Sequence, residues 1–265
     1  MNKTIFILSF IVARCNTVLE KKFNINNNMT FHGQEKQDYL LEEIVFKQCK
    51  DGFFVDVGAN HPEHINNTLY FERTNNWKGI NIEPIPTLYE KLQCIRSNCI
   101  NVNCAIDSKE GDFDFVLNQG YTESISGLEE YYHPRHKERL LKENQQFNSQ
   151  TKIVKICTKK LETIFDQHNV KHINYLTIDV EGAEFAVVQS INFDKVFIDV
   201  IEFDNNYENL SIPIVQYLEQ KGYHRFLQTM HIFMIHQDSK FVPNVKSYMQ
   251  QLNQEKQKQN NESDE

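Results

Sequence analysis

Two short stretches place an acidic side chain at the end of a buried, strand-like run. Residues 53–61 end in a turn that contains Asp56 and Gly58, and residues 79–84 end at Glu83. In a doubly wound sheet, a glycine turn after one strand approaches a ligand, and a carboxylate after the next strand takes ribose hydroxyls. Glu83 follows Gly58 by 25 positions (83 minus 58), close to the roughly 20 typical of such an acid. We therefore predict a nucleoside cofactor.

A second acidic centre lies further along the chain. Asp179 ends another strand-like run, and Glu181 is on the turn that follows, so both carboxylates are expected to face a pocket. Glu184 falls in the first turn of the next helix, where a negative charge suits the helix dipole. Glu202 and Asp204 complete a ring of acids. Such oxygens also suit Mg²⁺, but nothing in the pattern fixes a metal, and we predict none.

Between its ends the chain alternates strand-like and helix-like segments. Apolar residues recur at helical spacing in 37–48, and Pro84 and Pro86 suit the start of a further helix better than its interior. Gly222 is expected to cap a helix over 212–221. The earlier strand-like runs have the continuous apolar character of strands that are covered on both faces of a sheet. All the runs in this group are 53–57, 100–104, 175–180, 196–203, 223–227 and 231–236.

The last two strand-like runs are separated only by residues 228–230. So short a link permits a hairpin but not the crossover that a parallel pair needs. An otherwise parallel sheet with a terminal hairpin is the outline of a class I methyltransferase, whereas a dehydrogenase Rossmann domain lacks the hairpin. We therefore predict an α/β, Rossmann-like, doubly wound and mostly parallel sheet with a C-terminal antiparallel hairpin.

Three blocks of sequence narrow this prediction further. They are Asp56-Val-Gly-Ala-Asn60, Ile82-Glu-Pro84 and Ile178-Asp-Val-Glu-Gly-Ala-Glu184, and they occur in the expected order within residues 37–236. Together they resemble the FkbM-type S-adenosylmethionine-dependent methyltransferases. Thr177 stands where many members have lysine, and His61 and Pro62 stand where many have a second glycine. Both variants resemble those of one branch of the family.

The resemblance implies S-adenosyl-L-methionine as the cofactor and suggests which residues bind it. The turn after the first strand would hold the methionine part, with Gly58 allowing close approach and Asp56 orienting the loop or accepting from the ammonium group. Glu83 would bind the ribose. Ala105 and Ile106 would flank the adenine, and Asp107 would accept from its exocyclic amine. The predicted cofactor-binding residues are Asp56, Gly58, Ala59, Asn60, Glu83, Ala105 and Ile106.

Methyl transfer is an in-line displacement at a sulfonium, so the protein mainly positions the acceptor and, for a hydroxyl, supplies a base. Asp179 is the first candidate for that base or for holding the acceptor, and Glu181 is the second. The family implies a hydroxyl of a saccharide, glycan or small metabolite as acceptor. His133 is an alternative base, although a lone histidine is more often a surface or hydrogen-bonding residue.

The domain limits follow from composition. Residues 31–245 are expected to form the methyltransferase domain, interrupted by a lid-like insertion at about residues 119–149 that is too long for an ordinary connection. Residues 1–30 form an apolar and then Asn-rich segment. Residues 246–265 are rich in Gln, Asn, Lys and Glu, and this composition predicts a disordered polar tail.

The N-terminal segment leaves the cellular location open. Residues 3–14 have a lysine and then a short apolar run, which is far short of the roughly 20 residues that span a bilayer. A secretory signal or membrane association is possible there, and a cytoplasmic location is favoured; no integral span is expected. The net charge of -8 argues against general binding of nucleic acid, which needs an excess of Lys and Arg. The expected partner is therefore the small-molecule or glycan acceptor.

Two alternatives to an active methyltransferase stay open. One is an inactive protein of the same fold that binds a partner through the insertion. The other is a nicotinamide-dependent Rossmann oxidoreductase. The single-glycine turn and the terminal hairpin count against the oxidoreductase, because the pyrophosphate of a dinucleotide usually needs a fuller glycine-rich turn.

Overall fold

The computed structural model describes residues 30–263, with side chains described up to residue 254. The N-terminal segment of residues 1–30 therefore lies outside the described part except for Thr30. Within residues 30–263, no helix combines the length and the apolar character needed to cross a membrane.

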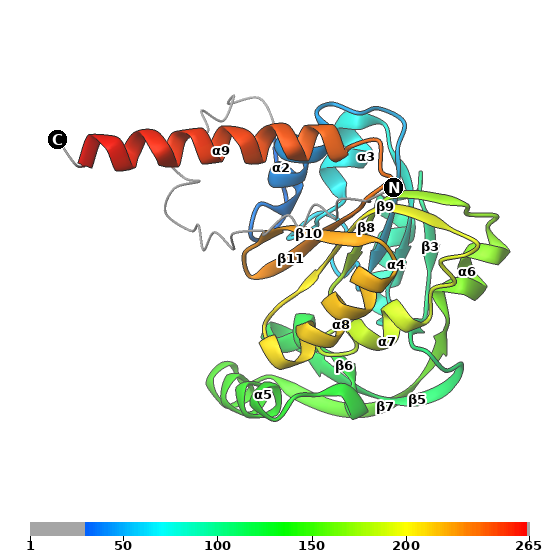
Figure 1. Cartoon of the computed structure of the whole chain (residues 1–265). Helices are drawn as coiled ribbons and strands as arrows, with labels where there is room; N and C mark the ends of the chain where they lie inside the picture. Colours follow the sequence, from blue (N-terminus) through cyan, green and yellow to red (C-terminus); the bar gives the residue numbers. More distant parts are fainter. Residues whose placement is uncertain (1–29, 264–265) are drawn as a thin grey trace.

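A seven-stranded sheet forms the centre of the molecule (Figure 1). Its strands pair in parallel except for the terminal hairpin, in which β11 runs antiparallel to both of its neighbours. This confirms the predicted mostly parallel sheet with a C-terminal hairpin. In spatial order the strands are β10 (Tyr223–Gln228), β11 (His231–His236), β9 (Phe197–Asp204), β8 (His172–Ile178), β1 (Phe53–Val57), β2 (Lys78–Ile82) and β3 (Ile100–Val102).

Apolar side chains alternate along the strands and build a core on each face of the sheet. On one face, aromatic residues of the sheet pack against α2 (Gln37–Leu41), the π-helix η1 (Glu42–Phe46), α3 (Leu69–Asn75) and the start of α9 (Val242–Ser263). On the other face, aliphatic residues pack against α6 (Leu161–Gln167), α7 (Glu184–Gln189) and α8 (Glu208–Gln220). The helix α4 (Pro86–Ile95) connects β2 to β3 and begins at a proline, as predicted.

A second, four-stranded sheet lies beyond the carboxyl ends of the central strands, in the lower part of Figure 1. Its order is β4 (Ala105–Ile106), β7 (Gln150–Lys159), β5 (Gly111–Gln119) and β6 (Gly127–Leu128). Between β5 and β7 come two 3₁₀ helices, η2 (Gly120–Ile125) and η3 (Glu129–Tyr131), and the helix α5 (Pro134–Phe147). The predicted insertion falls on this stretch. The sequence did not predict β7, because most of its residues are exposed and its apolar signal is weak.

Two helices differ from the sequence-based prediction. The helix predicted over 212–221 begins earlier, at Glu208, and continues through Pro213. The helix α9 covers most of the stretch for which we expected a disordered polar tail. Val245 is buried, and Tyr248 and Met249 pack against the same apolar cluster. Val245, Tyr248 and Met249 are three and four positions apart, so they form a short apolar stripe on one side of the helix. The average composition of the tail is polar, and for this reason the stripe was not predicted from the sequence. The domain limits themselves stay a prediction.

Candidate active site

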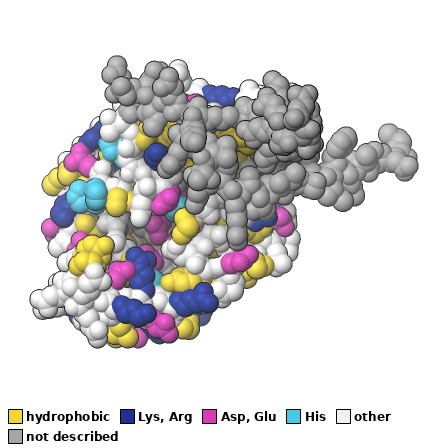
Figure 2. All heavy atoms as spheres, turned by 90° about the vertical axis from the view of Figure 1, so that its left-hand side faces the viewer, with side chains coloured by type: hydrophobic (Ala, Val, Ile, Leu, Met, Phe, Trp, Pro, Cys, Tyr) yellow, Lys and Arg dark blue, Asp and Glu magenta, His cyan; other side chains and the backbone are white. Residues whose placement is uncertain are grey.

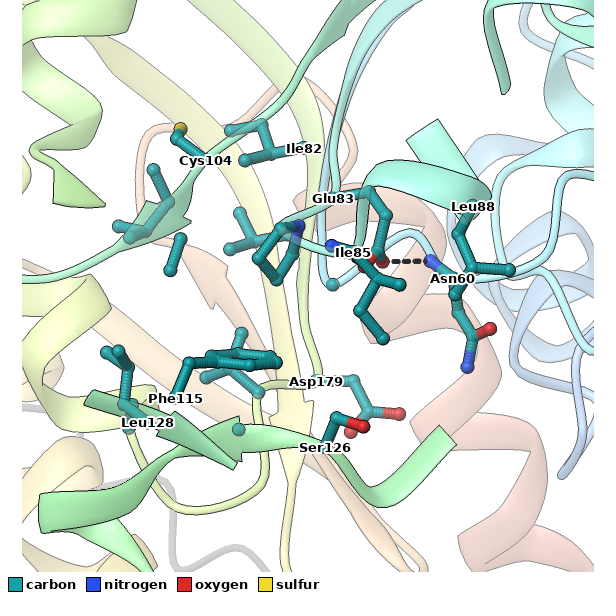
Figure 3. Close-up of a pocket in the computed structure, with 18 of the residues that line it drawn as sticks. Asn60, Ile82, Glu83, Ile85, Leu88, Cys104, Phe115, Ser126, Leu128 and Asp179 are labelled. Carbon is teal, nitrogen blue, oxygen red and sulfur yellow. Dashed lines mark hydrogen bonds between the residues drawn. The ribbon is translucent and has the colours of Figure 1, made fainter. Parts of the chain in front are cut away.

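A cleft opens where the carboxyl ends of the central strands face the small sheet (Figure 3). Its open volume is about 540 Å³. Ligands of open α/β sheets bind at this edge, because the loops after neighbouring strands diverge there. Of the predicted cofactor-binding and catalytic residues, those that line the cleft are Gly58, Asn60, Glu83, Ala105, Ile106 and Asp179.

The turn after β1 brings two loops of the site into contact. Gly58 has a φ of 87°, in the left-handed region that favours glycine. A Cβ atom at this position would lie 1.9 Å from the backbone carbonyl oxygen of Asp179. The backbone N–H groups of Gly58 and Ala59 both donate to the carbonyl of Ile82, at 3.0 and 3.1 Å. Only glycine therefore lets the turn after β1 pack against the end of β8.

Glu83 follows β2 and ties the two loops together. One carboxyl oxygen accepts from the backbone N–H of Asn60, and the other accepts from the backbone N–H of Ile85, both at 2.8 Å (Figure 3). Each carboxylate oxygen has a second lone pair, so both can still accept from a ligand hydroxyl. Burial raises the pKa of Glu83 to about 7. This arrangement suits a carboxyl that receives hydrogen bonds from a ribose.

One end of the cleft is apolar. Ala105 and Ile106, which we expected to flank an adenine ring, are buried there. Phe115 and Leu128 of the small sheet, both buried, form the opposite wall (Figure 3). Sequence analysis missed these two residues, because they belong to strands that it did not predict. A flat aromatic base fits between such walls better than a charged group does.

Asp179 lies toward the other side of the cleft, next to Ser126 in Figure 3. Its side chain is exposed to the open cleft, although protein surrounds it on most sides. This enclosure raises the pKa of Asp179, whereas the charge of His231 acts in the opposite direction. A carboxyl that is enclosed yet accessible is suited to take a proton from a bound substrate.

Two of the predicted cofactor-binding residues do not line the cleft. The carboxyl of Asp56 accepts a hydrogen bond from Thr68 Oγ1 at 2.8 Å. Thr68 also accepts from the buried Arg96, at 3.0 Å, so Asp56 belongs to a buried polar network behind the turn. Ala59 is buried. For Asp56 this geometry favours the loop-orienting role over contact with the cofactor's ammonium group.

Glu181 also points away from the cleft, although it is only two residues from Asp179. Its Oε2 lies 3.3 Å from Nδ1 of His136, a fully buried residue of α5. Burial raises the pKa of Glu181 well above its usual value, and burial lowers the pKa of His136. Glu181 lines a separate, small pocket, together with Glu184 and Asp204. Glu181 therefore does not line the main cleft with Asp179, although the charge of Asp179 also raises the pKa of Glu181.

The described part of the chain has no cluster of side chains suited to bind a metal ion at the cleft. Within residues 30–263, no three side chains of His, Cys, Asp or Glu are arranged to hold a metal ion. Glu184 instead accepts hydrogen bonds from backbone N–H groups, at 2.9 Å from Gly182 and 3.4 Å from Val180. This matches the helix-start role expected of Glu184.

The insertion is fastened to the domain at several points around the cleft. Tyr131 donates its hydroxyl to Asp107 Oδ2 at 2.9 Å. This contact and the hydrogen bonds of Asp107 to its own loop compete with the expected bond from Asp107 to an adenine amine. His133 stacks on Tyr207, with ring centroids 4.3 Å apart, and it does not line the cleft. These contacts favour an anchoring role for His133 over a catalytic one.

Figure 2 shows a face of the molecule on which acidic side chains lie in and around a hollow. Lys and Arg side chains gather lower on this face, at the height of α5, whose sequence includes Arg135, Lys137 and Arg139. Charges of both signs are therefore interspersed on this face. A continuous basic surface of the kind that binds nucleic acid is not seen there.

The chain was compared with known proteins. The family model described as "Methyltransferase FkbM domain" matches residues 56–225, which is well over half of the chain. The match runs from Asp56, near the end of β1, into β10 of the terminal hairpin, and it includes the small sheet. No curated protein matches the chain.

Proposed function

The chain belongs to the FkbM methyltransferase family, whose members use S-adenosylmethionine, and we propose that it methylates a hydroxyl of a saccharide, glycan or small metabolite. The observation that carries this proposal is the position of Asp179, exposed in the same cleft whose other residues suit the cofactor. A carboxylate there can meet a hydroxyl as it approaches the methyl group.

The residues of the cleft suggest how the cofactor is bound. We assign the adenine to the apolar end, between Ala105 and Phe115. Glu83 would accept hydrogen bonds from the ribose hydroxyls, and the turn at Gly58 and Asn60 would hold the methionine part. In this orientation the reactive methyl group would lie on the side of the cleft where Asp179 is exposed. The protein excludes water from the apolar end and leaves the other end accessible to an acceptor.

The chemical step then needs one proton acceptor. The acceptor oxygen forms a bond to the methyl carbon as the carbon–sulfur bond breaks, and the sulfur keeps the electron pair of that bond. The hydroxyl proton passes to the Asp179 carboxylate and then to solvent. The products are the methyl ether and the demethylated thioether. General bases contribute typically 10²- to 10⁴-fold to such steps.

A transfer assay tests this assignment. The full chain is incubated with S-adenosylmethionine carrying a labelled methyl group and with panels of neutral glycans, simple saccharides and hydroxylated metabolites. We expect label in at least one hydroxyl-bearing acceptor. Label found only on amines or carboxyls, with hydroxyl compounds inert, would contradict the proposed acceptor class.

Asp179→Asn tests the role of the carboxylate. This change removes the base but keeps a side chain of the same size, so we expect turnover to fall about 100-fold or more, with cofactor affinity changing little. The control is Asp194→Asn, at an exposed position away from the cleft. Equal losses of turnover and cofactor affinity in Asp179→Asn would show that the residue acts in binding and not as the base.

A further inference from the structure

Behind Asp179, on the same edge of the sheet, lies a buried histidine with a carboxylate partner. His231 begins β11, and its Nδ1 is 2.6 Å from Oε1 of Glu202 on β9. The side chain of His231 is 9% exposed and that of Glu202 is 1% exposed. Because an isolated buried charge is strongly unfavourable, such a pair is retained only where the two charges balance each other.

The carboxylate of Glu202 is fixed on its other side. Its Oε2 accepts hydrogen bonds from Thr177 Oγ1 at 2.5 Å and from the Tyr175 hydroxyl at 2.9 Å, both on β8. Three groups, from His231, Thr177 and Tyr175, thus converge on one carboxylate and hold it in place. The imidazole of His231 therefore lies beside a carboxyl group that is held in one position.

The sheet register carries this pair to the active site. His231 pairs with Asp204 on β9, and Ile178 pairs with Phe203, so Asp179, Asp204 and His231 follow one another across three strands. Two strand spacings amount to about 10 Å between backbones. Residues at matching positions point to the same face, so the side chains of Asp179 and His231 lie on one face at one edge.

Most charged groups around His231 are negative. Glu202, Asp204 and Asp179 all act on it, and they outweigh burial, which alone would lower the pKa of His231; the pKa is raised to about 9. Around Asp179, burial is the largest influence and Glu202 adds to it, while His231 and Arg139 of α5 oppose both. Of these two cations, His231 has the larger effect on Asp179.

We propose that His231, held by Glu202, is the internal cation that keeps Asp179 ionised, and so ready to take the acceptor's proton. This inference rests on the proposed function of Asp179. His231 is a positioning residue in this account: it lies behind the reacting groups and acts through Asp179. Thr177 belongs to the same unit, because its hydroxyl fixes Glu202.

The contact on the far side of the imidazole responds to its charge. Nε2 of His231 lies 2.8 Å from Nε2 of Gln37, whose Oε1 accepts from the backbone N–H of Glu35 at 2.9 Å. This orientation suits a neutral ring, whose Nε2 accepts. A protonated ring has two donors, so Gln37 must turn its amide and present the oxygen.

Nuclear magnetic resonance on the full chain tests the proposal without a cofactor or an acceptor. Histidine ring signals and Asp side-chain carboxyl signals are followed from about pH 4 to about pH 10. The His231 signal is identified by its loss in His231→Gln. We expect His231 to titrate near 9 in the unmodified protein. A midpoint at or below the ordinary value near 6.5 would overturn the proposal.

Two variants then separate an electrostatic role from a structural one. In His231→Gln the Asp179 midpoint should rise by about one pH unit or more, because an opposite charge has been removed. In Glu202→Gln the His231 midpoint should fall. The control is His224→Gln, on the exposed side of the neighbouring strand β10, which should move neither midpoint. Thermal unfolding verifies that each variant is folded.

An unchanged Asp179 midpoint in a folded His231→Gln protein would overturn the proposal. Should His231→Gln fail to fold, the His231 midpoint in the unmodified protein and in Glu202→Gln still decides it. Binding of S-adenosylmethionine, measured separately, tests the proposed function. If the chain binds the cofactor but the Asp179 midpoint does not change in His231→Gln, this inference is contradicted and the proposed function is not.

Discussion

At the scale of single residues, the site depends on how closely two turns approach each other. Gly58 has a positive φ, and its α-carbon faces the backbone of Asp179 with no room for a methyl group. The turn to which we assign the cofactor and the loop of the proposed base are therefore in direct backbone contact. A side chain at Gly58 would separate the end of β1 from the end of β8.

This geometry makes a prediction for Gly58→Ala. The positive φ alone costs about 1–2 kcal/mol for a residue with a Cβ, and the 1.9 Å contact adds displacement of the Asp179 loop. We expect a lower urea midpoint and loss of measurable cofactor binding. Gly120→Ala is the matched control, since its φ is also positive but its nearest neighbour, Ser149 Oγ, is 3.5 Å away. Equal effects in both variants would refute the role of the contact.

Residue types and spacing predicted part of this site. Gly58 and Glu83 were found because a glycine turn and a strand-end acid have a local signature. The orientation of Asp56 and Glu181 could not be predicted in this way. Each carboxyl points to a partner distant in sequence, Thr68 for Asp56 and His136 for Glu181. His231 was missed for the same reason, since its partner Glu202 is on another strand.

At the scale of secondary-structure elements, the small sheet acts as the second wall of the cleft. Residues 111–119 of β5 pair with residues 150–158 of β7 without interruption. This wall is therefore held together by a continuous antiparallel pair. Gly182 lies against η3, which follows β6, and a Cβ there would be 2.5 Å from the carbonyl oxygen of Tyr131. The central sheet was predictable from its continuous apolar strands. The small sheet was not, because its outer face is exposed and polar.

Tyr131→Phe tests whether the wall matters for binding. It removes the hydroxyl that donates to Asp107 and leaves the ring in place, so the loss is one hydrogen bond worth about 0.5–1.5 kcal/mol. We expect cofactor affinity to weaken several-fold in calorimetry while the fold is retained. Tyr121→Phe, at an exposed position, should bind normally. Unchanged affinity in Tyr131→Phe would mean that the wall is held without this bond.

At the scale of the whole molecule, buried carboxyls make stability depend on pH. Burial raises the pKa of Asp56 and Glu184 to about 6, of Glu83 to about 7 and of Asp204 to about 8. Because the folded state holds these protons more tightly than the unfolded state, folding is favoured at low pH and loses that advantage as pH rises through these values.

We therefore expect the urea midpoint to fall as pH increases from about 6 to about 8. His231, whose pKa is also raised, extends the loss toward pH 9. His136 opposes the trend only on the acid side, because its pKa is lowered by burial. Denaturation followed by circular dichroism at several pH values measures this. A midpoint that is constant or rises across this range would contradict the enclosed environment of the carboxyls.

The central claim is that the cleft binds S-adenosylmethionine, with its adenine at the apolar end and its ribose at Glu83. Isothermal titration of the full chain with S-adenosylmethionine, its demethylated product and NAD tests this most directly. We predict one-to-one binding of the first two, lost in Glu83→Ala and kept in Glu138→Ala at an exposed position, with no binding of NAD. Binding of NAD alone, or no binding of either S-adenosyl compound, would contradict the account.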